Sequence, residues 1–245
     1  MASESHLYFV FLVDIEDSGR RWDRAKTVLN DDMNKAVAAA LERVGLDLDD
    51  VPASDRGDGM LILLPSNLSP PILLRELIRG LNDALTDLGD ERTSAFRMRL
   101  RAGLHWGNVS RKGEKWTGQA IDHLHELVDS DPARKELRAA EGAHMVFVVS
   151  ESIYRGVVEG RHTGVDPAAY TRFDFVTKHL EERHGWLTIP EHPPVRGAAR
   201  APADEGGRPP RAGGGATAPG RNFVNNGTSS GMVIMGDVHG GNFGK

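Results

Sequence analysis

Residues 53–65, "ASDRGDGMLILLP", join a Gly-Asp-Gly turn to a strongly apolar run. Asp-Gly between apolar segments is a strong hairpin signal, so the sequence predicts a strand at 51–54 paired with another at 60–65. Asp58 lies at the mouth of this hairpin. Its residue type and place fit two interpretations, an ordinary turn residue or a ligand of a metal ion, and the rest of the chain has to decide between them.

Apolar periodicity predicts the elements around the hairpin. We expect a central strand over 6–15, helices over 21–44 and 70–88, a strand over 96–109, a helix over 118–140 with a break at Pro132, a strand over 144–150, a short helix over 151–160, and a final strand pair at 170–177 and 185–190. The order β-α-β-β-α-β predicts an α+β fold with a ferredoxin-like core and extra C-terminal elements.

Composition limits the class of protein. The chain has 245 residues, 39% of them hydrophobic, a net charge of −5 and no cysteine. These values indicate a soluble globular protein without disulfides or thiolate metal sites, and they do not favour a general nucleic-acid binder. The first residues carry no basic segment, and their apolar run is too short to span a bilayer. We therefore expect a cytoplasmic protein with no nucleic-acid or membrane partner.

Composition also divides the chain. Residues 1–190 alternate apolar segments with turns and are expected to form the folded domain. Residues 191–221 are rich in Pro, Gly, Ala and Arg, a mixture that cannot bury enough apolar surface to fold, so they are expected to be a disordered linker. Residues 222–245 are a separate β-prone segment.

Two carboxylates fall at informative places. Asp14 ends the first predicted strand and Asp58 lies in the hairpin that commonly pairs with that strand, so the two could meet at one rim and hold Mg²⁺ or Mn²⁺. Ser18, Gly19 and the following helix N-terminus could offer N–H groups to a phosphate. The structural alternative is that Asp14 caps the next helix. The alternating Arg97, Arg99 and Arg101 are expected to form a solvated sheet face, with contact to an acidic partner as the alternative.

These stretches, taken in order through residues 6–190, resemble the class III nucleotidyl cyclases. The resemblance is carried by "FLVDIEDSGRRW", "SDRGDGMLILLP", "RAGLHWGNV", "TGQAIDHLHEL", "VVSESIYRGV" and "DFVTKHLEERHGWLTI". "DPAAY" and the lysine of the final hairpin also resemble a cyclase-homology group found in actinobacteria. The resemblance implies a domain that dimerises with a second copy or with a different partner.

The resemblance also implies roles for individual residues. Asp14 and Asp58 would be the two metal-binding aspartates, assisted by the carbonyl of Ile15. The residues implied to approach the nucleotide are Ser18, Gly19, Gly57 and the triphosphate lysine, Lys178.

Four positions depart from the family pattern. Ser54 replaces the purine-selecting lysine and Lys115 replaces its aspartate partner. Asp122 replaces the asparagine that positions the ribose, and Glu126 replaces the arginine that stabilises the pentavalent phosphate. A carboxylate there repels the developing negative charge. Three interpretations remain: a degenerate cyclase that binds a nucleotide or acts as a scaffold, the metal-supplying half of a heterodimer, and an active enzyme with altered chemistry.

The end of the chain carries a second resemblance. "GMVIMGDVHGGNF" is apolar on both faces of a predicted strand and contains no proline, which is typical of a cross-β zipper. It resembles bacterial amyloid-signalling motifs and, more loosely, the RIP homotypic interaction motif; the alternative is a disordered tail. The residues expected to assemble are Met232, Val233, Ile234, Val238, Asn242 and Phe243. Together, the domain and tail predict a signalling protein of a conflict or defence system, with a sensor or effector that carries a matching motif.

Overall fold

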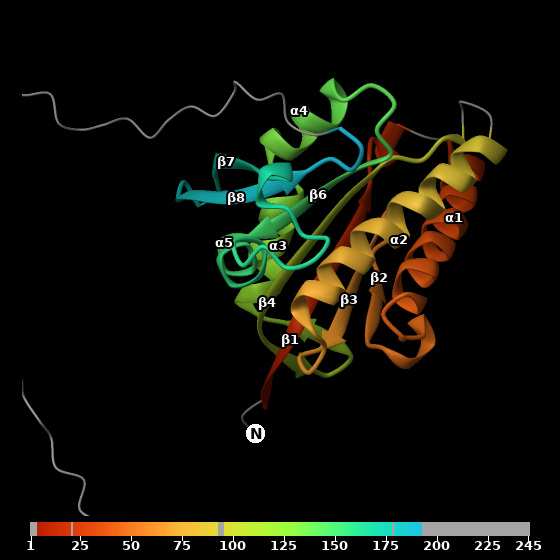
Figure 1. Cartoon of the computed structure of the whole chain (residues 1–245). Helices are drawn as coiled ribbons and strands as arrows, with labels where there is room; N and C mark the ends of the chain where they lie inside the picture. Colours follow the sequence, from red (N-terminus) through yellow and green to blue (C-terminus); the bar gives the residue numbers. More distant parts are fainter. Residues whose placement is uncertain (1–3, 21, 93–95, 178, 193–245) are drawn as a thin grey trace, which may run out of the picture. The chain divides into compact units, whose positions relative to one another are not determined.

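The computed structural model describes residues 4–20, 22–92, 96–177 and 179–192 (Figure 1). Strand β1 (Ser5–Ile15) lies in the middle of an eight-stranded sheet formed by these residues. The sheet order is β2-β3-β1-β4-β6-β8-β7, with β5 paired to β4. The predicted linker 191–221 and the predicted tail segment 222–245 lie outside the described residues, apart from Glu191 and His192.

The first half of the chain forms the ferredoxin-like core that the sequence predicts. Strand β1 pairs antiparallel with β3 on one side and with β4 on the other, and β2 extends the sheet beyond β3. The elements of this half are α1 (Asp23–Glu42), β2 (Ala53–Asp55), β3 (Gly59–Pro65), α2 (Pro70–Glu91) and β4 (Leu100–Lys112). The predicted hairpin around Asp58 is therefore confirmed, and it lies directly beside β1.

Helices cover both faces of the sheet because β1 is apolar on both faces. Phe9, Phe11 and Val13 pack with α1 and α2, which lie side by side in Figure 1. Val10 and Leu12 point to the other face, toward α3 (Gln119–Val128) and α4 (Asp131–Ala139). Because side chains alternate along a strand, Asp14 shares the face of Val10 and Leu12. The position of Asp14 on the α3 side follows from this alternation.

The C-terminal elements extend the core as expected. Strand β6 (Met145–Ser150) runs parallel to β4, and β7 (Thr171–Val176) and β8 (Glu182–Thr188) form an antiparallel pair beside it. The segment predicted as a short helix begins as α5 (Glu151–Ile153) and continues as a π-helix over Tyr154–Val158. In the described part of the chain, no helix is long and apolar enough to cross a membrane.

One boundary differs from the prediction, one predicted helix break is confirmed, and one strand was not predicted. Strand β4 begins at Leu100 rather than at residue 96, because β1 ends at Ile15 and its partner in the ladder is Leu100. The segment 118–140 forms two helices, since Ser130 caps α4 with its hydroxyl accepting from the Ala133 N–H; the predicted break near Pro132 is confirmed. Strand β5 (Lys115–Thr117), which the sequence analysis missed, folds back on β4.

Candidate nucleotide and metal site

The structure brings Asp14 and Asp58 together at one rim of the sheet. Asp14 pairs in register with Gly59, and the Ile15 N–H donates to the Asp58 carbonyl at 2.8 Å. Gly59 permits this approach, because a Cβ there would lie 2.7 Å from the Val13 carbonyl oxygen. The two aspartates are therefore neighbours, Asp14 near the end of β1 and Asp58 in the turn just before β3, as the predicted hairpin implies.

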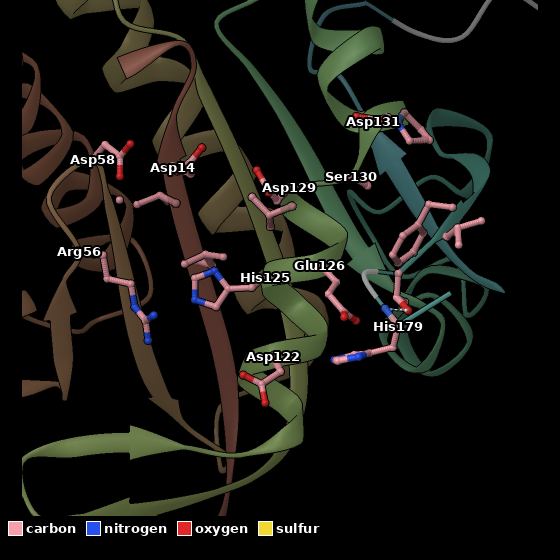
Figure 2. Close-up of a pocket in the computed structure, with 18 of the residues that line it drawn as sticks. Asp14, Arg56, Asp58, Asp122, His125, Glu126, Asp129, Ser130, Asp131 and His179 are labelled. Carbon is pink, nitrogen blue, oxygen red and sulfur yellow. Dashed lines mark hydrogen bonds between the residues drawn. The ribbon is translucent and has the colours of Figure 1, made fainter. Parts of the chain in front are cut away.

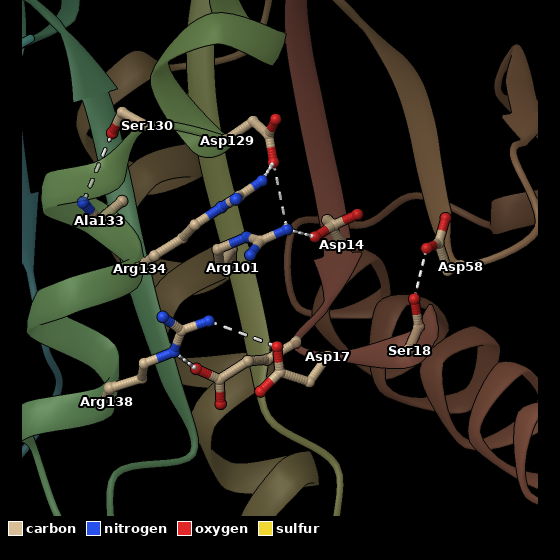
Figure 3. A network of polar contacts seen from close by, with 11 residues as sticks. Asp14, Asp17, Ser18, Asp58, Arg101, Asp129, Ser130, Ala133, Arg134 and Arg138 are labelled. Atoms are coloured by element: carbon tan, nitrogen blue, oxygen red, sulfur yellow. Dashed lines mark hydrogen bonds and ion pairs between the residues drawn. The ribbon is translucent and has the colours of Figure 1, made fainter. Parts of the chain in front are cut away.

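Ser18 joins the same rim. Asp17 adopts a left-handed conformation (φ 54°) that turns the chain after β1, and Ser18 then donates a hydrogen bond from its hydroxyl to the Asp58 carboxylate (Figure 3). Gly19 follows in a single turn of 3₁₀ helix over Ser18–Arg20. Gly57 has a positive φ of 89°, which the hairpin turn requires. Ser18, Gly19 and Gly57 thus lie in the two turns that flank the aspartates.

Arg101 pairs with Asp14 across the sheet. The two residues are directly opposite in the ladder between β1 and β4, and the Arg101 guanidinium donates to the Asp14 carboxylate. The same Nη2 lies 3.4 Å from Asp129 Oδ1, and Arg134 of α4 donates to that oxygen as well (Figure 3). Arg101 is only 8% exposed. The prediction of a solvated arginine face is therefore wrong for Arg101, because α3 and α4 cover this part of the sheet.

A second group of ion pairs lies one turn further along α4. Arg138 pairs with Asp17 at 3.4 Å and with Glu16 at 3.9 Å. Arg99 lies 3.5 Å from Glu16 and also donates to the Leu137 carbonyl. These contacts attach α4 to the end of β1, independently of Arg134.

Burial changes the acidity of Asp14. Its pKa is raised to about 6, mainly because burial disfavours the charged carboxylate, while the neighbouring Arg101 opposes the rise. The adjacent Asp58 raises the pKa further. Two close carboxylates with one elevated pKa are a common feature of functional sites.

A cavity of about 860 Å³ opens between the rim and α3 (Figure 2). Asp14, Asp58 and Arg56 line one wall, and the opposite wall carries Asp122, His125 and Glu126 of α3 and Asp129 just after it. Asp122 and Glu126, two positions that depart from the family pattern, therefore face the same space as the aspartate pair. Ser54 in β2 and Lys115 in β5 are not among the described residues that line it.

Comparison with known proteins identifies the fold. No protein-family model matches the chain, and no curated protein matches it by sequence. Among solved structures, the guanylyl cyclase Cya2 is 12% identical, with a TM-score of 0.52 over 78% of this chain and 96% of the other. An adenylate/guanylate cyclase/hydrolase from Silicibacter pomeroyi is 14% identical, with a TM-score of 0.53 over 77% and 99%. The described residues between 4 and 192 have the fold of a class III nucleotidyl cyclase domain.

The donor set of this cyclase-type domain fits a hard divalent cation. Among the described residues, no three His, Asp or Glu side chains gather closely enough to hold a metal by themselves. Two carboxylates and a backbone carbonyl are the kind of partial oxygen site that suits Mg²⁺ or Mn²⁺, which usually keep positions for water and phosphate oxygens. Lys178, the lysine implied to reach the triphosphate, lies outside the described residues.

A second hollow of about 760 Å³ adjoins α3 of the cyclase-type domain. It is lined by His105, Asn108, His123 and Arg183, and shares Asp122, Glu126 and His179 with the first cavity.

Arg183 Nη1 lies 3.5 Å from Glu126 and donates to His123 Nδ1 at 3.0 Å. Burial lowers the pKa of His105 to about 4 and also lowers that of His123. Both imidazoles are therefore neutral at pH 7, and Arg183 is the cation that Glu126 contacts.

Three arginines of this region were not predicted from the sequence to belong to it: Arg101, Arg134 and Arg183. For Arg101 a signal was available, since antiparallel pairing of the first and fourth predicted strands would place it opposite Asp14. Arg134 and Arg183 reach the site from α4 and β8, and their positions depend on how these elements pack.

Proposed function

We propose that the cyclase-type domain binds a nucleoside triphosphate together with Mg²⁺ or Mn²⁺ and does not cyclise it. The observation that carries the proposal is the juxtaposition of Asp14 and Asp58 at the rim of a cavity large enough for a nucleotide. The likeness to cyclase structures supports the fold on which the proposal rests.

In this proposal Asp14, Asp58 and the Ile15 carbonyl hold the cation. The cation would neutralise phosphate charge. Ser18, Gly19 and Gly57 present the turns next to the aspartates, where backbone N–H groups can bind phosphate oxygens. Lys178 would contact the triphosphate, as the resemblance implies.

The opposite wall supports the absence of cyclisation. Glu126 stands where the family pattern has an arginine, and its nearest cation, Arg183, is already shared with His123 and Glu181. A carboxylate that faces the reacting phosphate repels the negative charge that develops in the transition state, and so raises the energy of that state. Asp122 adds a second negative charge on the same helix face. Ser54 and Lys115 further imply that the base is not selected in the family's way.

A heterodimer is the second candidate. The altered residues Asp122 and Glu126 lie on α3, whereas Asp14 and Asp58 lie on the β1–β3 rim. A partner domain that supplies asparagine and arginine could complete a catalytic site against this rim, in which case the pair would make a cyclic nucleotide. A homodimer would carry the same defect in both sites.

One experiment separates these candidates. The full chain is incubated with each of the four nucleoside triphosphates and Mn²⁺, nucleotide binding is measured by calorimetry, and the products are analysed by mass spectrometry. We expect binding without cyclic product. Cyclic product from the chain alone identifies an active enzyme, and product that appears only with a cyclase-type partner identifies the heterodimer.

We further propose that residues 222–245 recruit a partner by strand addition. The resemblance to amyloid-signalling motifs supports this role, which would make the chain a cytoplasmic signalling component of a conflict or defence system. We expect deletion of 222–245 to abolish seeded fibril formation, measured by thioflavin fluorescence, while nucleotide affinity stays unchanged. Equal fibril formation by the full and shortened chains would contradict it.

A further inference from the structure

Both carboxylates of the proposed metal site have partners within the chain. Asp58 accepts a hydrogen bond from Ser18, and Asp14 accepts one from Arg101 (Figure 3). Arg101 Nη2 also approaches Asp129, the carboxylate that Arg134 contacts from α4. One guanidinium thus lies between two carboxylates, where it supplies the positive charge that a divalent cation would otherwise supply.

We propose that Arg134 pairs with Asp129 while Arg101 holds Asp14, and turns to phosphate when a cation takes Asp14 and Arg101 keeps its contact with Asp129. The proposal rests on the proposed function and adds Arg134 as a phosphate-binding residue. The cation would pair with Asp14, Asp129 would keep Arg101, whose Nη2 already lies 3.4 Å from it, and Arg134 would exchange Asp129 for phosphate. Because guanidinium groups bind phosphate through two parallel N–H donors, the exchange keeps the arginines paired throughout.

The position of Arg134 makes this exchange feasible. Its side chain is 35% exposed, so it can turn without breaking the core. The start of α4 is fixed by the Ser130 cap and by Pro132, and Arg138 and Arg99 attach the helix to the end of β1. Loss of Arg134 should therefore leave α4 in place. Lys135, the next residue, is exposed and offers a matched variant with the same loss of charge.

The exchange predicts effects of opposite sign for two ligands. Without Arg134, Asp129 is free to draw Arg101 away from Asp14, and the local potential becomes more negative, so a cation alone binds more tightly. In the variant with cation bound, the guanidinium of Arg134 is no longer available to phosphate, so phosphate binds more weakly than in the natural chain. The coupling between two ligands is reciprocal: if the cation raises the affinity for phosphate, phosphate raises the affinity for the cation by the same factor. We expect this mutual increase in the natural chain and a smaller one in the Arg134 variant.

The test is calorimetry on the full chain with Mn²⁺ alone and then with pyrophosphate at saturating Mn²⁺. For Arg134→Ala we expect Mn²⁺ affinity to rise roughly threefold to tenfold and pyrophosphate affinity to fall by a similar factor. Lys135→Ala should match the natural chain for both ligands. A folding defect cannot produce opposite signs, because it would weaken both.

Two results would overturn different claims. If Arg134→Ala matches Lys135→Ala, or shifts both ligands in one direction, the exchange is wrong while the metal site stands. If Mn²⁺ binding is absent, or is the same in Asp58→Asn as in the natural chain, the proposed function itself fails.

Discussion

Asp58→Asn is expected to weaken binding of a nucleoside triphosphate in the presence of Mn²⁺ by about a hundredfold or more, since it removes one of two anionic ligands from the cation. The asparagine keeps an oxygen that can accept from Ser18, so the hairpin turn should survive. Isothermal titration with the nucleotide at saturating Mn²⁺ measures the effect.

Asp55→Asn is the matched control for this prediction. Asp55 lies in the same hairpin, is exposed, and accepts from the Gly57 N–H at 2.7 Å through an oxygen that asparagine retains. Asp55→Asn removes the same charge three residues from Asp58, and we expect this variant to bind the nucleotide as tightly as the natural chain does. Equal losses in the two variants would mean that general charge, rather than coordination by Asp58, governs binding.

The second large effect concerns stability and follows from the burial of Arg101. Arg101→Met should lower the free energy of unfolding by about 2 kcal/mol at pH 8, because it leaves the partly buried carboxylate of Asp14 without its main counter-charge. Urea denaturation measures the loss. The exposed Arg172 pairs only with the still more exposed Asp174 among the ion pairs described, so Arg172→Met should cost no more than about 1 kcal/mol.

The loss in Arg101→Met should depend on pH. Asp14 already has a pKa raised to about 6, and removing Arg101 raises that pKa further. A carboxyl whose pKa is raised by folding makes its full contribution to the free energy of unfolding only below its pKa in the unfolded chain, 3.8 for Asp14. That contribution is lost as the pH rises through the higher pKa of the folded chain. The gap between the natural chain and the variant should therefore be small near pH 4 and widen above pH 6. A pH-independent gap would show that lost packing, and not the charge of Asp14, is responsible.

A double variant isolates the same interaction. Asp14→Asn in the Arg101→Met background removes the uncompensated charge, so the double variant should be more stable at pH 8 than Arg101→Met alone. Residues that contact each other are expected to show such non-additivity. If the losses in free energy of unfolding of the two single variants simply add in the double variant, the destabilisation does not come from the Asp14–Arg101 interaction.

Much of this architecture is predictable from local patterns. The apolar run of β1 and the Asp-Gly turn before β3 predict a strand beside a hairpin, and together they place Asp14 near Asp58. Local patterns do not predict the environment of Arg97, Arg99 and Arg101, because alternating arginines have the same sequence pattern whether solvent or a helix covers them. Only the packing of α3 and α4 shows that Arg101 is buried. Strand β5 and the contact of Arg183 with Glu126 likewise depend on tertiary pairing.

Mass spectrometry of the full chain incubated with each nucleoside triphosphate and saturating Mn²⁺, with Asp58→Asn in parallel, distinguishes nucleotide binding from cyclisation. We expect a bound nucleotide to be recovered unchanged from the natural chain and little nucleotide to be bound by the variant. A cyclic nucleotide made by the natural chain and lost in Asp58→Asn would contradict this expectation.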